Sequence, residues 1–517
     1  MTKKSQIAQS SLTLMLVITV AKLIGMLRDV VLANYFGTTN VSDAYLIAVS
    51  VPSYLFFFIG HSLSTAYLPM YNKIRHEQGE EKAQRYTNAL ISLAMVIATV
   101  IVAVLLLFPE VIVRIFAAGF DDATLKLTSK FVRISAVSLY FMTVINVWGG
   151  YLHAKDNYLI PASISLPRNA MIMISIVLAA TFHVNFLGVG LLCAYIAEFL
   201  LLLPFVLKKG FKPRFSLEYK TPEIKETMYL VLPILLGVAV GQINKIIDRS
   251  VASTVVDGGI SALTYACILN NAVQEILVTG IITILFSKCA SWVAEGKHEL
   301  VKKKLSQTVN TMVFLLVPAS CGIITCGRLI VKCILCRGEF DERSLQLTTG
   351  SLCCYTVGLL FLALRDTFVK VCYAYKNTKV TTLSSIIAIA VNIVLNLILS
   401  RFLGINGLAL ATSISAVVNF FILYVYLHKK LRGFGLGQSL VVLLQTSLAS
   451  AGMFVSIWWI QPKLLQTGMG ELLVLFLCVG IGVLVYGVLS LLLHNRVPLG
   501  WIRTVLNRLK KKPTANS

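Results

Sequence analysis

Charged residues are scarce in this sequence. Asp, Glu, Lys and Arg make up 13% of the 517 residues, whereas 57% are hydrophobic and the mean hydropathy is +0.81. No soluble core requires so much apolar sequence. The composition therefore predicts an all-α polytopic membrane protein.

Acidic residues are the scarcest charged group: there are 23, against 46 basic residues, so the formal net charge is +23. An excess of this kind is also typical of nucleic-acid-binding proteins. Here the basic residues fall in the short loops between apolar runs, and the positive-inside rule explains them more simply. We therefore expect a membrane environment and no nucleic-acid partner.

Motifs of catalysis are missing. The sequence has no Walker loop, no H-E-x-x-H and no G-x-S-x-G in a soluble context, which argues against an enzyme and against ATP-driven transport by this chain alone. The cysteine count of 11 is odd, and most of these residues lie in apolar runs, so a disulfide framework is not expected. Cys333 and Cys336 form one C-x-x-C without a second pair or a nearby histidine, which disfavours a metal or redox role.

A cleavage site is also missing from the start of the chain. Residues 1–25 have the Lys-then-apolar order of a signal peptide, but no small-residue cleavage site follows, and Arg28 and Asp29 come directly after. This order predicts a retained first helix.

Long apolar runs dominate what remains. Windows of about 20 residues predict fourteen membrane-spanning helices. They lie near residues 11–33, 43–71, 88–108, 129–152, 159–182, 186–207, 226–252, 260–292, 307–327, 346–374, 379–400, 404–427, 438–460 and 471–493.

The loops between these runs alternate in charge. Lysines and arginines collect in every second loop, as around Lys73, Lys209, Lys303 and Lys430, whereas opposite loops such as NYFGTTNVSD, FHVNF and TVVDGG are short and have none. The positive-inside rule then predicts that both termini are cytoplasmic. The basic tail 496–517 is expected to form an amphipathic helix on the inner leaflet.

The chain also resembles itself at a shift of about 220 residues. FLGVGLLCAYIA at 186–197 returns as FLGINGLALATSIS at 402–415, and YLHAKDNYLIP at 151–161 returns as CYAYKNTKVTT at 372–382. Six spans separate the copies, an even number, so both halves share one orientation, as in transporters with parallel repeats. This predicts two six-helix lobes around a central cavity, followed by two helices and the tail: 1–215, 216–432, 433–495 and 496–517.

The first predicted helix holds charges at a depth where lipid should surround the chain. Lys22, Gly25 and Asp29 are spaced i, i+3, i+7 and share one face, with Arg28 beside them. Each charge costs roughly 2.5–3.5 kcal/mol at the centre of a bilayer. Either Arg28 and Asp29 form a structural pair, or this face meets water and binds a charged molecule.

The seventh predicted helix carries the same spacing in Gln242, Lys245 and Arg249, with Asp248 beside them. At the repeat shift, Asp248 and Arg249 fall on Arg28 and Asp29 of the first helix, so the charged pair returns in reversed order. If both faces line the cavity, it is wet and net basic and suits a diphosphate or another anion. The alternative is a set of salt bridges that hold the bundle together.

Other polar residues inside spans have two interpretations. Asn392 and Asn396 lie one turn apart, Thr412 lies on the next helix, and with Asp248 they offer oxygen ligands for a small hard cation. Small polar side chains also hold membrane helices together. Further charges in spans either pair with one another or lie near helix ends, among them Arg168, Glu198, Arg365 and Asp366.

The sequence resembles the MurJ (MviN) family of lipid II flippases, in the MOP superfamily that also holds the multidrug MATE exporters. The motifs that carry the resemblance are GMLRDVVLANYFG, SDAYLIAVSVP, INKIIDRSVASTVVDGGISALTYACILN and GLALATSIS. It implies fourteen helices in two lobes, a V-shaped central cavity, and a lipid-tail groove built partly by the last two helices.

The resemblance also implies a function. The family moves an undecaprenyl-diphosphate-linked peptidoglycan precursor from the inner to the outer leaflet of the bacterial inner membrane, by alternating access. Its essential charged positions match here as Lys22, Arg28, Asp29 and Asp43. Cell-wall synthesis proteins are expected partners. Sodium-binding relatives suggest Na⁺ or H⁺ as the coupling ion, and no other cofactor is expected.

Two cations that the family pattern would place in the cavity are missing. Phe56–Phe58 replace a stretch with arginine, Gly60 and His61 replace an acidic region, and Ile268 replaces another arginine. Three interpretations stay open: Lys245 and Arg249 compensate, the chain carries a different polyprenyl-linked glycan, or it is a transport-inactive scaffold in envelope assembly. A MATE-like drug exporter is disfavoured, since organic cations need an acidic or aromatic cavity.

Overall fold

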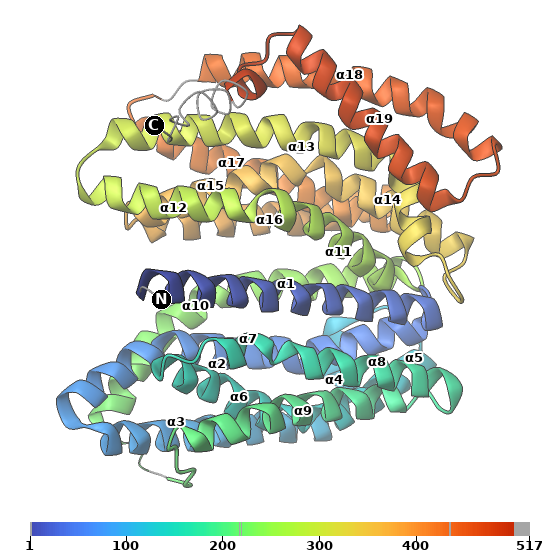
Figure 1. The fold of residues 1–517 in the computed structure, drawn as a ribbon. Helices are drawn as coiled ribbons and strands as arrows, with labels where there is room; N and C mark the ends of the chain where they lie inside the picture. Colours follow the sequence, from blue (N-terminus) through green and yellow to red (C-terminus); the bar gives the residue numbers. More distant parts are fainter. Residues whose placement is uncertain (1–2, 217, 219, 434–435, 501–517) are drawn as a thin grey trace, which may run out of the picture. The chain divides into compact units, whose positions relative to one another are not determined.

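The computed structural model describes residues 3–216, 218, 220–433 and 436–500. Over these residues the chain is helical, without strands (Figure 1). The helices are α1 (Lys3–Phe36), α2 (Asn40–Gln78), α3 (Glu80–Leu107), α4 (Pro109–Phe116), α5 (Asp122–Ala136), α6 (Ser138–Ala154), α7 (Leu159–Ser163), α8 (Ser165–Thr181), α9 (Phe186–Lys208), α10 (Pro222–Val255), α11 (Gly259–Leu277), α12 (Thr279–Ala294), α13 (His298–Leu335), α14 (Glu342–Val357), α15 (Leu359–Ala374), α16 (Thr378–Leu403), α17 (Ile405–Lys430), α18 (Leu436–Gln466) and α19 (Glu471–Leu492).

Many of these helices are long and apolar enough to cross a bilayer. In the described part of the chain, 8 spans meet this test as single helices, and the count reaches 11 when each bent pair of helices is one span. The predicted spans 11–33, 43–71 and 226–252 fall within α1, α2 and α10, which have 34, 39 and 34 residues. The fold class is confirmed, and the total of fourteen spans stays a prediction.

The chain forms two compact units. Unit 1 contains Met1–Ser261 and Arg337–Asp341, and unit 2 contains Ala262–Cys336 and Glu342–Ser517. This division follows packing, whereas the predicted lobes 1–215 and 216–432 follow the sequence repeat. α10 belongs to unit 1 because it packs against α2.

The short segment 337–341 belongs to unit 1 through a backbone contact with α1. The Glu339 N–H donates to the Asn34 carbonyl oxygen at 2.9 Å. Gly338 precedes it with φ +57°, and a Cβ there would lie 2.2 Å from the same oxygen. Only glycine combines this backbone conformation with so close an approach.

The two halves bend at matching positions of the repeat. α5 and α6 meet at Val137 with a bend of 44°, and α14 and α15 meet at Gly358 with a bend of 47°. These breaks are separated by the repeat distance that the sequence predicts. A similar kink in two copies is expected when both descend from one helical unit with the same packing requirement.

The core of unit 1 forms where α2, α3, α6 and α9 pack together. Tyr67, Tyr71 and Tyr151 are fully buried there. Trp148 of α6 stacks on Phe199 of α9, with 5.1 Å between ring centroids. Large aromatic side chains thus join four helices into one rigid bundle.

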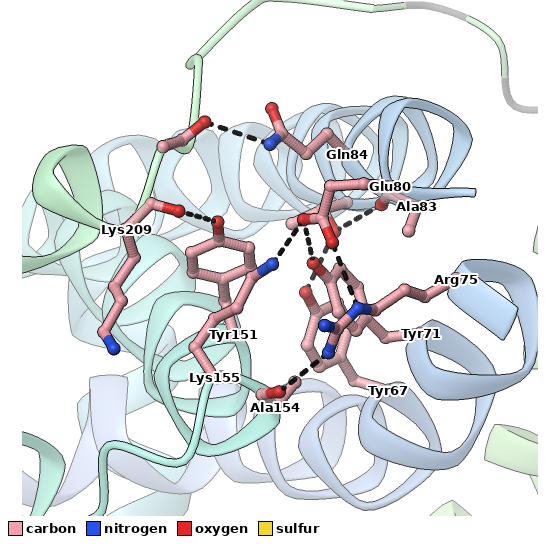
Figure 2. Close-up of polar contacts among 12 residues, drawn as sticks. Tyr67, Tyr71, Arg75, Glu80, Ala83, Gln84, Tyr151, Ala154, Lys155 and Lys209 are labelled. Carbon is pink, nitrogen blue, oxygen red and sulfur yellow. Dashed lines mark hydrogen bonds and ion pairs between the residues drawn. The ribbon is translucent and has the colours of Figure 1, made fainter.

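A polar cluster adjoins this core (Figure 2). Glu80, the first residue of α3, accepts hydrogen bonds from the Tyr71 hydroxyl at 2.7 Å and from Lys155 Nζ at 2.6 Å. Arg75 Nε lies 3.2 Å from its second carboxylate oxygen. One carboxylate therefore ties together α2, α3 and the end of α6.

The connection from α9 to α10 lies along α3. Asn88 donates from Nδ2 to the Lys212 carbonyl at 2.9 Å and accepts from the Arg214 N–H at 3.1 Å. Ser92, one helical turn further, accepts from the Ser216 N–H at 3.0 Å. Polar side chains on one face of α3 thus bind the backbone groups of this connection.

In unit 2, α18 and α19 pack against α13. The Tyr486 hydroxyl of α19 donates to the Phe314 carbonyl of α13 at 2.7 Å, and Gln445 Nε2 of α18 donates to the Leu493 carbonyl at 2.8 Å. These are the two helices predicted within 433–495, and a lipid-tail groove beside them stays a prediction. The predicted tail helix lies outside the described residues from position 501 onward.

Candidate functional site

The charged face of α1 packs against α8 within unit 1. Arg28 Nη1 donates to Asn169 Oδ1 of α8 at 3.1 Å. Gly25, one turn earlier, faces the same side chain, and a Cβ at this position would lie 3.5 Å from Asn169 Nδ2. A small residue thus lets the two helices approach where the polar contact forms.

Arg28 and Asp29 form an ion pair. Asp29 Oδ1 accepts from Arg28 Nε at 3.0 Å and from Arg28 Nη2 at 2.7 Å. The Arg28 side chain is 28% exposed and the Asp29 side chain is 13% exposed. The carboxylate therefore lies behind the guanidinium and is shielded more strongly.

A cavity of about 340 Å³ opens beside this pair. Three helices of unit 1 contribute to its wall: Ile18, Ala21, Lys22, Gly25 and Arg28 from α1, Ala162 from α7, and Ser165, Arg168 and Asn169 from α8. Among the described residues, this wall contains three cations and no carboxylate. Such a cavity attracts anions and repels organic cations.

Arg168 is a cavity residue to which the sequence analysis assigned no specific role. Its Nη1 lies 3.2 Å from Glu198 Oε1 of α9, in ion-pair contact without the alignment of a hydrogen bond. In the sequence, the only indication of a role for Arg168 was the presence of an arginine and a glutamate in successive apolar spans. Sequence spacing did not show that the arginine shares a wall with Lys22 and Arg28.

Asp43 is placed elsewhere in unit 1. It is 1% exposed, and its Oδ1 and Oδ2 accept from the backbone N–H groups of Ser261 at 2.7 Å and Ile260 at 3.4 Å. These donors belong to the first turn of α11, whose N–H groups have no partner within their own helix. Asp43 thus caps a helix, and it is not among the residues that line the cavity.

Lys245 and Arg249 of α10 contact α2. Arg249 Nη1 donates to the Leu46 carbonyl at 2.9 Å. Its guanidinium lies 5.5 Å from the centroid of the Tyr54 ring, and Lys245 Nζ lies 5.9 Å from the same centroid. These two cations therefore form a second basic group in unit 1, outside the wall of the α1–α8 cavity.

The neutral side chains of the predicted cation set come together in unit 2. Asn396 Nδ2 donates to Asn392 Oδ1 at 3.1 Å, and Asn392 Nδ2 donates to Thr412 Oγ1 at 3.5 Å. Asp248 lies on α10 in unit 1, where it accepts from Asn244 Nδ2 at 3.2 Å. A sodium site formed by these residues stays a prediction.

Among the residues that the structure describes, no other set of metal ligands is seen. No group of three His, Cys, Asp or Glu residues that could hold a metal ion occurs in the part of the chain that the structure describes. All 11 cysteines are free thiols, Cys333 and Cys336 included.

At the positions that depart from the family pattern, the structure shows apolar packing. Phe56 is buried, and its ring would be 2.1 Å from a Cβ at Gly60. Ile268 is half-buried in α11. The side chains of Phe58 and His61 lie outside the described residues.

Comparison with solved structures defines the class of protein. A multidrug resistance MATE family transporter of the MOP superfamily in an inward-facing conformation matches with a TM-score of 0.66 at 13% identity, over 80% of this chain and 94% of that chain. This likeness shows the fold. The chain therefore shares the helical fold of that protein.

The family follows from sequence. The profile of the family described as "Lipid II flippase MurJ" matches residues 32–478, and the chain belongs to this family. A "Probable lipid II flippase MurJ" of Bdellovibrio bacteriovorus is 25% identical over 475 residues, covering 90% of this chain and 91% of the relative. The lipid II flippase MurJ of Thermosipho africanus is 27% identical over 399 residues, covering 77% and 81%.

A solved structure of the same family agrees with both results. The lipid II flippase MurJ in an inward closed conformation matches this chain with a TM-score of 0.80 at 25% identity. The match covers 92% of this chain and 97% of that chain. The similarity thus extends over nearly the whole fold.

Proposed function

We propose that this chain is a flippase that carries lipid II, an undecaprenyl-diphosphate-linked peptidoglycan precursor, from the cytoplasmic to the outer leaflet. The observation that carries the proposal is the α1–α8 cavity, whose described wall holds Lys22, Arg28 and Arg168 without a carboxylate. The names of the relatives support lipid II as the substrate.

Transport requires that the negative charge of the diphosphate is stabilised. A diphosphate is costly to move through hydrocarbon, because each buried charge loses its hydration. Guanidinium and ammonium groups replace that hydration with charge-assisted hydrogen bonds. The polyprenyl tail needs no such help and can stay in the lipid. No covalent bond of the substrate changes, so the proposed activity is transport and not catalysis.

Arg28 is built to hold an anion in a defined place. Its guanidinium has five N–H donors. The hydrogen bonds to Asp29 and Asn169 use three of them and fix the orientation of the group. Two donors remain for a phosphate oxygen in the cavity that Arg28 lines.

The setting of this activity follows the charge of the loops. We infer a bacterial inner membrane with both termini cytoplasmic, because lysines and arginines are concentrated in the loops on one side of the predicted spans. Alternating access of the two halves of the repeat would expose the cavity first to one leaflet and then to the other. Enzymes that make and consume the peptidoglycan precursor are the expected partners.

Substitution of Arg28 tests this function. In proteoliposomes that contain lipid II, Arg28→Ala is expected to abolish translocation while the protein stays inserted and folded. Arg133→Ala is the matched control, because Arg133 is an exposed arginine of unit 1 that does not line the cavity. Normal flipping by the Arg28 variant would contradict the proposal.

Exchange of the pair separates a binding role from a structural one. Arg28→Asp with Asp29→Arg keeps both charges but rotates the cation by about 100° around the helix. A structural pair tolerates this exchange. A diphosphate site does not, so we expect the exchanged protein to lose transport.

A further inference from the structure

Arg168 lies at the cavity although its ion-pair partner does not. It precedes Asn169, which binds Arg28, and it lines the cavity together with Lys22 and Arg28. The Arg168 side chain is 33% exposed, whereas the Glu198 side chain is 2% exposed. The cationic end of this pair therefore reaches the cavity wall and the anionic end lies within the protein.

Arg28 shows the same arrangement on another helix. Its side chain is 28% exposed, and the Asp29 side chain behind it is 13% exposed. In both pairs the longer arginine reaches the cavity, and the shorter acidic side chain stays shielded. Two arginines from two helices, each with a shielded carboxylate behind it, indicate that the cations themselves are needed at the wall.

The charges of this region favour an anion with two centres. Lys22, Arg28 and Arg168 line the cavity, and Asp29 and Glu198 each form an ion pair with one of the two arginines. The protein thus offsets the charge of each arginine in the absence of substrate. A diphosphate has two phosphate groups, and α1 and α8 each present an arginine for one of them.

We propose that Arg168 is a further substrate-binding residue, which contacts the diphosphate of the transported lipid from α8 and is positioned by Glu198. This inference rests on the proposed function and adds a residue to its site. It assigns Glu198 a positioning role: the buried carboxylate holds the guanidinium at the cavity wall.

Binding of a short polyprenyl diphosphate tests the proposal. The full-length protein in lipid nanodiscs is titrated with farnesyl diphosphate and with farnesyl monophosphate. For Arg168→Gln we expect diphosphate affinity to fall by about tenfold to a hundredfold, the loss typical of a charged hydrogen bond. Monophosphate affinity is expected to fall less, so selectivity for the diphosphate decreases. Arg168→Lys should lie between this variant and the natural protein.

A double variant distinguishes two roles of Arg168: binding of the diphosphate and neutralisation of the Glu198 carboxylate. Arg168→Gln alone leaves a buried carboxylate without its cation, which can unfold the protein. Arg168→Gln with Glu198→Gln removes both charges and leaves no such orphan. If Arg168 binds the diphosphate, the double variant folds but still binds it weakly. Affinity equal to that of the natural protein would overturn the proposal, because Arg168 would then serve only to neutralise Glu198.

Arg28→Ala in the same titration distinguishes the two proposals. Loss of binding in this variant, together with full binding in the Arg168 and Glu198 double variant, overturns the role of Arg168 and leaves the flippase function intact. Full binding in both variants overturns the cavity as the diphosphate site altogether. Arg133→Gln is the control and is expected to bind like the natural protein.

Discussion

Each unit contains an arginine followed by an aspartate on a membrane helix, and the two pairs have the same internal geometry. In unit 1, Arg28 contacts Asp29 Oδ1 from Nε at 3.0 Å and from Nη2 at 2.7 Å. In unit 2, Arg365 of α15 contacts Asp366 Oδ1 with the same two distances. Adjacent residues on a helix thus form the same pair in both units.

The neighbouring amide makes the difference between the pairs. In unit 1, Asn169 accepts from the cation at 3.1 Å. In unit 2, Gln274 of α11 donates to the anion, Asp366 Oδ2, at 2.8 Å. The first arrangement orients the guanidinium at a cavity, and the second fixes the carboxylate. One dipeptide therefore serves two purposes, and the helix packed against it decides which.

Removal of the charge of Arg28 or of Arg365 should give the largest difference between the units, measured as the rate of lipid translocation. Arg28→Ala is expected to reduce the rate of lipid translocation by at least about a hundredfold, because a charge-assisted contact to the diphosphate is lost. Arg365→Ala is expected to change the rate by less than about threefold, since its pair is fixed through the carboxylate. Initial rates in matched proteoliposomes measure both. Equal losses would erase the distinction between the units.

The predicted cation set offers a second contrast between the units. If Asp248 completes an ion site with Asn392, Asn396 and Thr412, transport depends on a sodium or proton gradient, and Asp248→Asn removes that dependence. We expect the ratio of transport rates with and without the gradient to fall to about one in this variant. Membrane potential alone supplies roughly 2.3 kcal/mol per charge per 100 mV, so it is held at zero in this assay.

An unchanged gradient response in Asp248→Asn would remove the ion-site hypothesis. The three neutral residues would then be interpreted as polar contacts between α16 and α17. Asn244→Ala is a suitable control, because it alters the neighbour of Asp248 and leaves the carboxylate in place.

The smallest contrast concerns the free energy of unfolding. Asp29 is 13% exposed at its side chain, and Asp366 is 36% exposed. Asp29→Asn removes the charge of the more buried carboxylate and leaves Arg28 without its ion pair, which is expected to cost about 2–4 kcal/mol. Asp366→Asn weakens a more exposed pair and is expected to cost about 1 kcal/mol or less. Thermal unfolding in detergent should therefore show the larger loss for Asp29→Asn, and the reverse order would contradict the burial argument.

Several features of this protein could be predicted from the sequence, because they are local. Apolar runs of bilayer length specify membrane helices, since every backbone group must be satisfied within its own segment in lipid. The spacing of Lys22, Gly25 and Asp29 places them on one helix face, and Arg28 pairs with its neighbour in sequence. The repeat was visible for the same reason, because each copy carries its own local pattern.

The remaining features were decided by the tertiary structure. Arg168 shares a cavity wall with Lys22, which is far away in the sequence, and Asp43 caps a helix that begins more than 200 residues later. Arg249, matched by the repeat to the charged pair of α1, instead reaches the Leu46 carbonyl of α2.

Helical periodicity determines which residues share a face, but it does not determine which helix that face meets. In lipid the apolar faces are nearly equivalent, since hydrocarbon surrounds them all. The choice of neighbour therefore depends on close packing at small residues such as Gly25 and on a few polar contacts between helices. Those contacts exist only in the folded protein, and they decide which of its buried charges line the cavity.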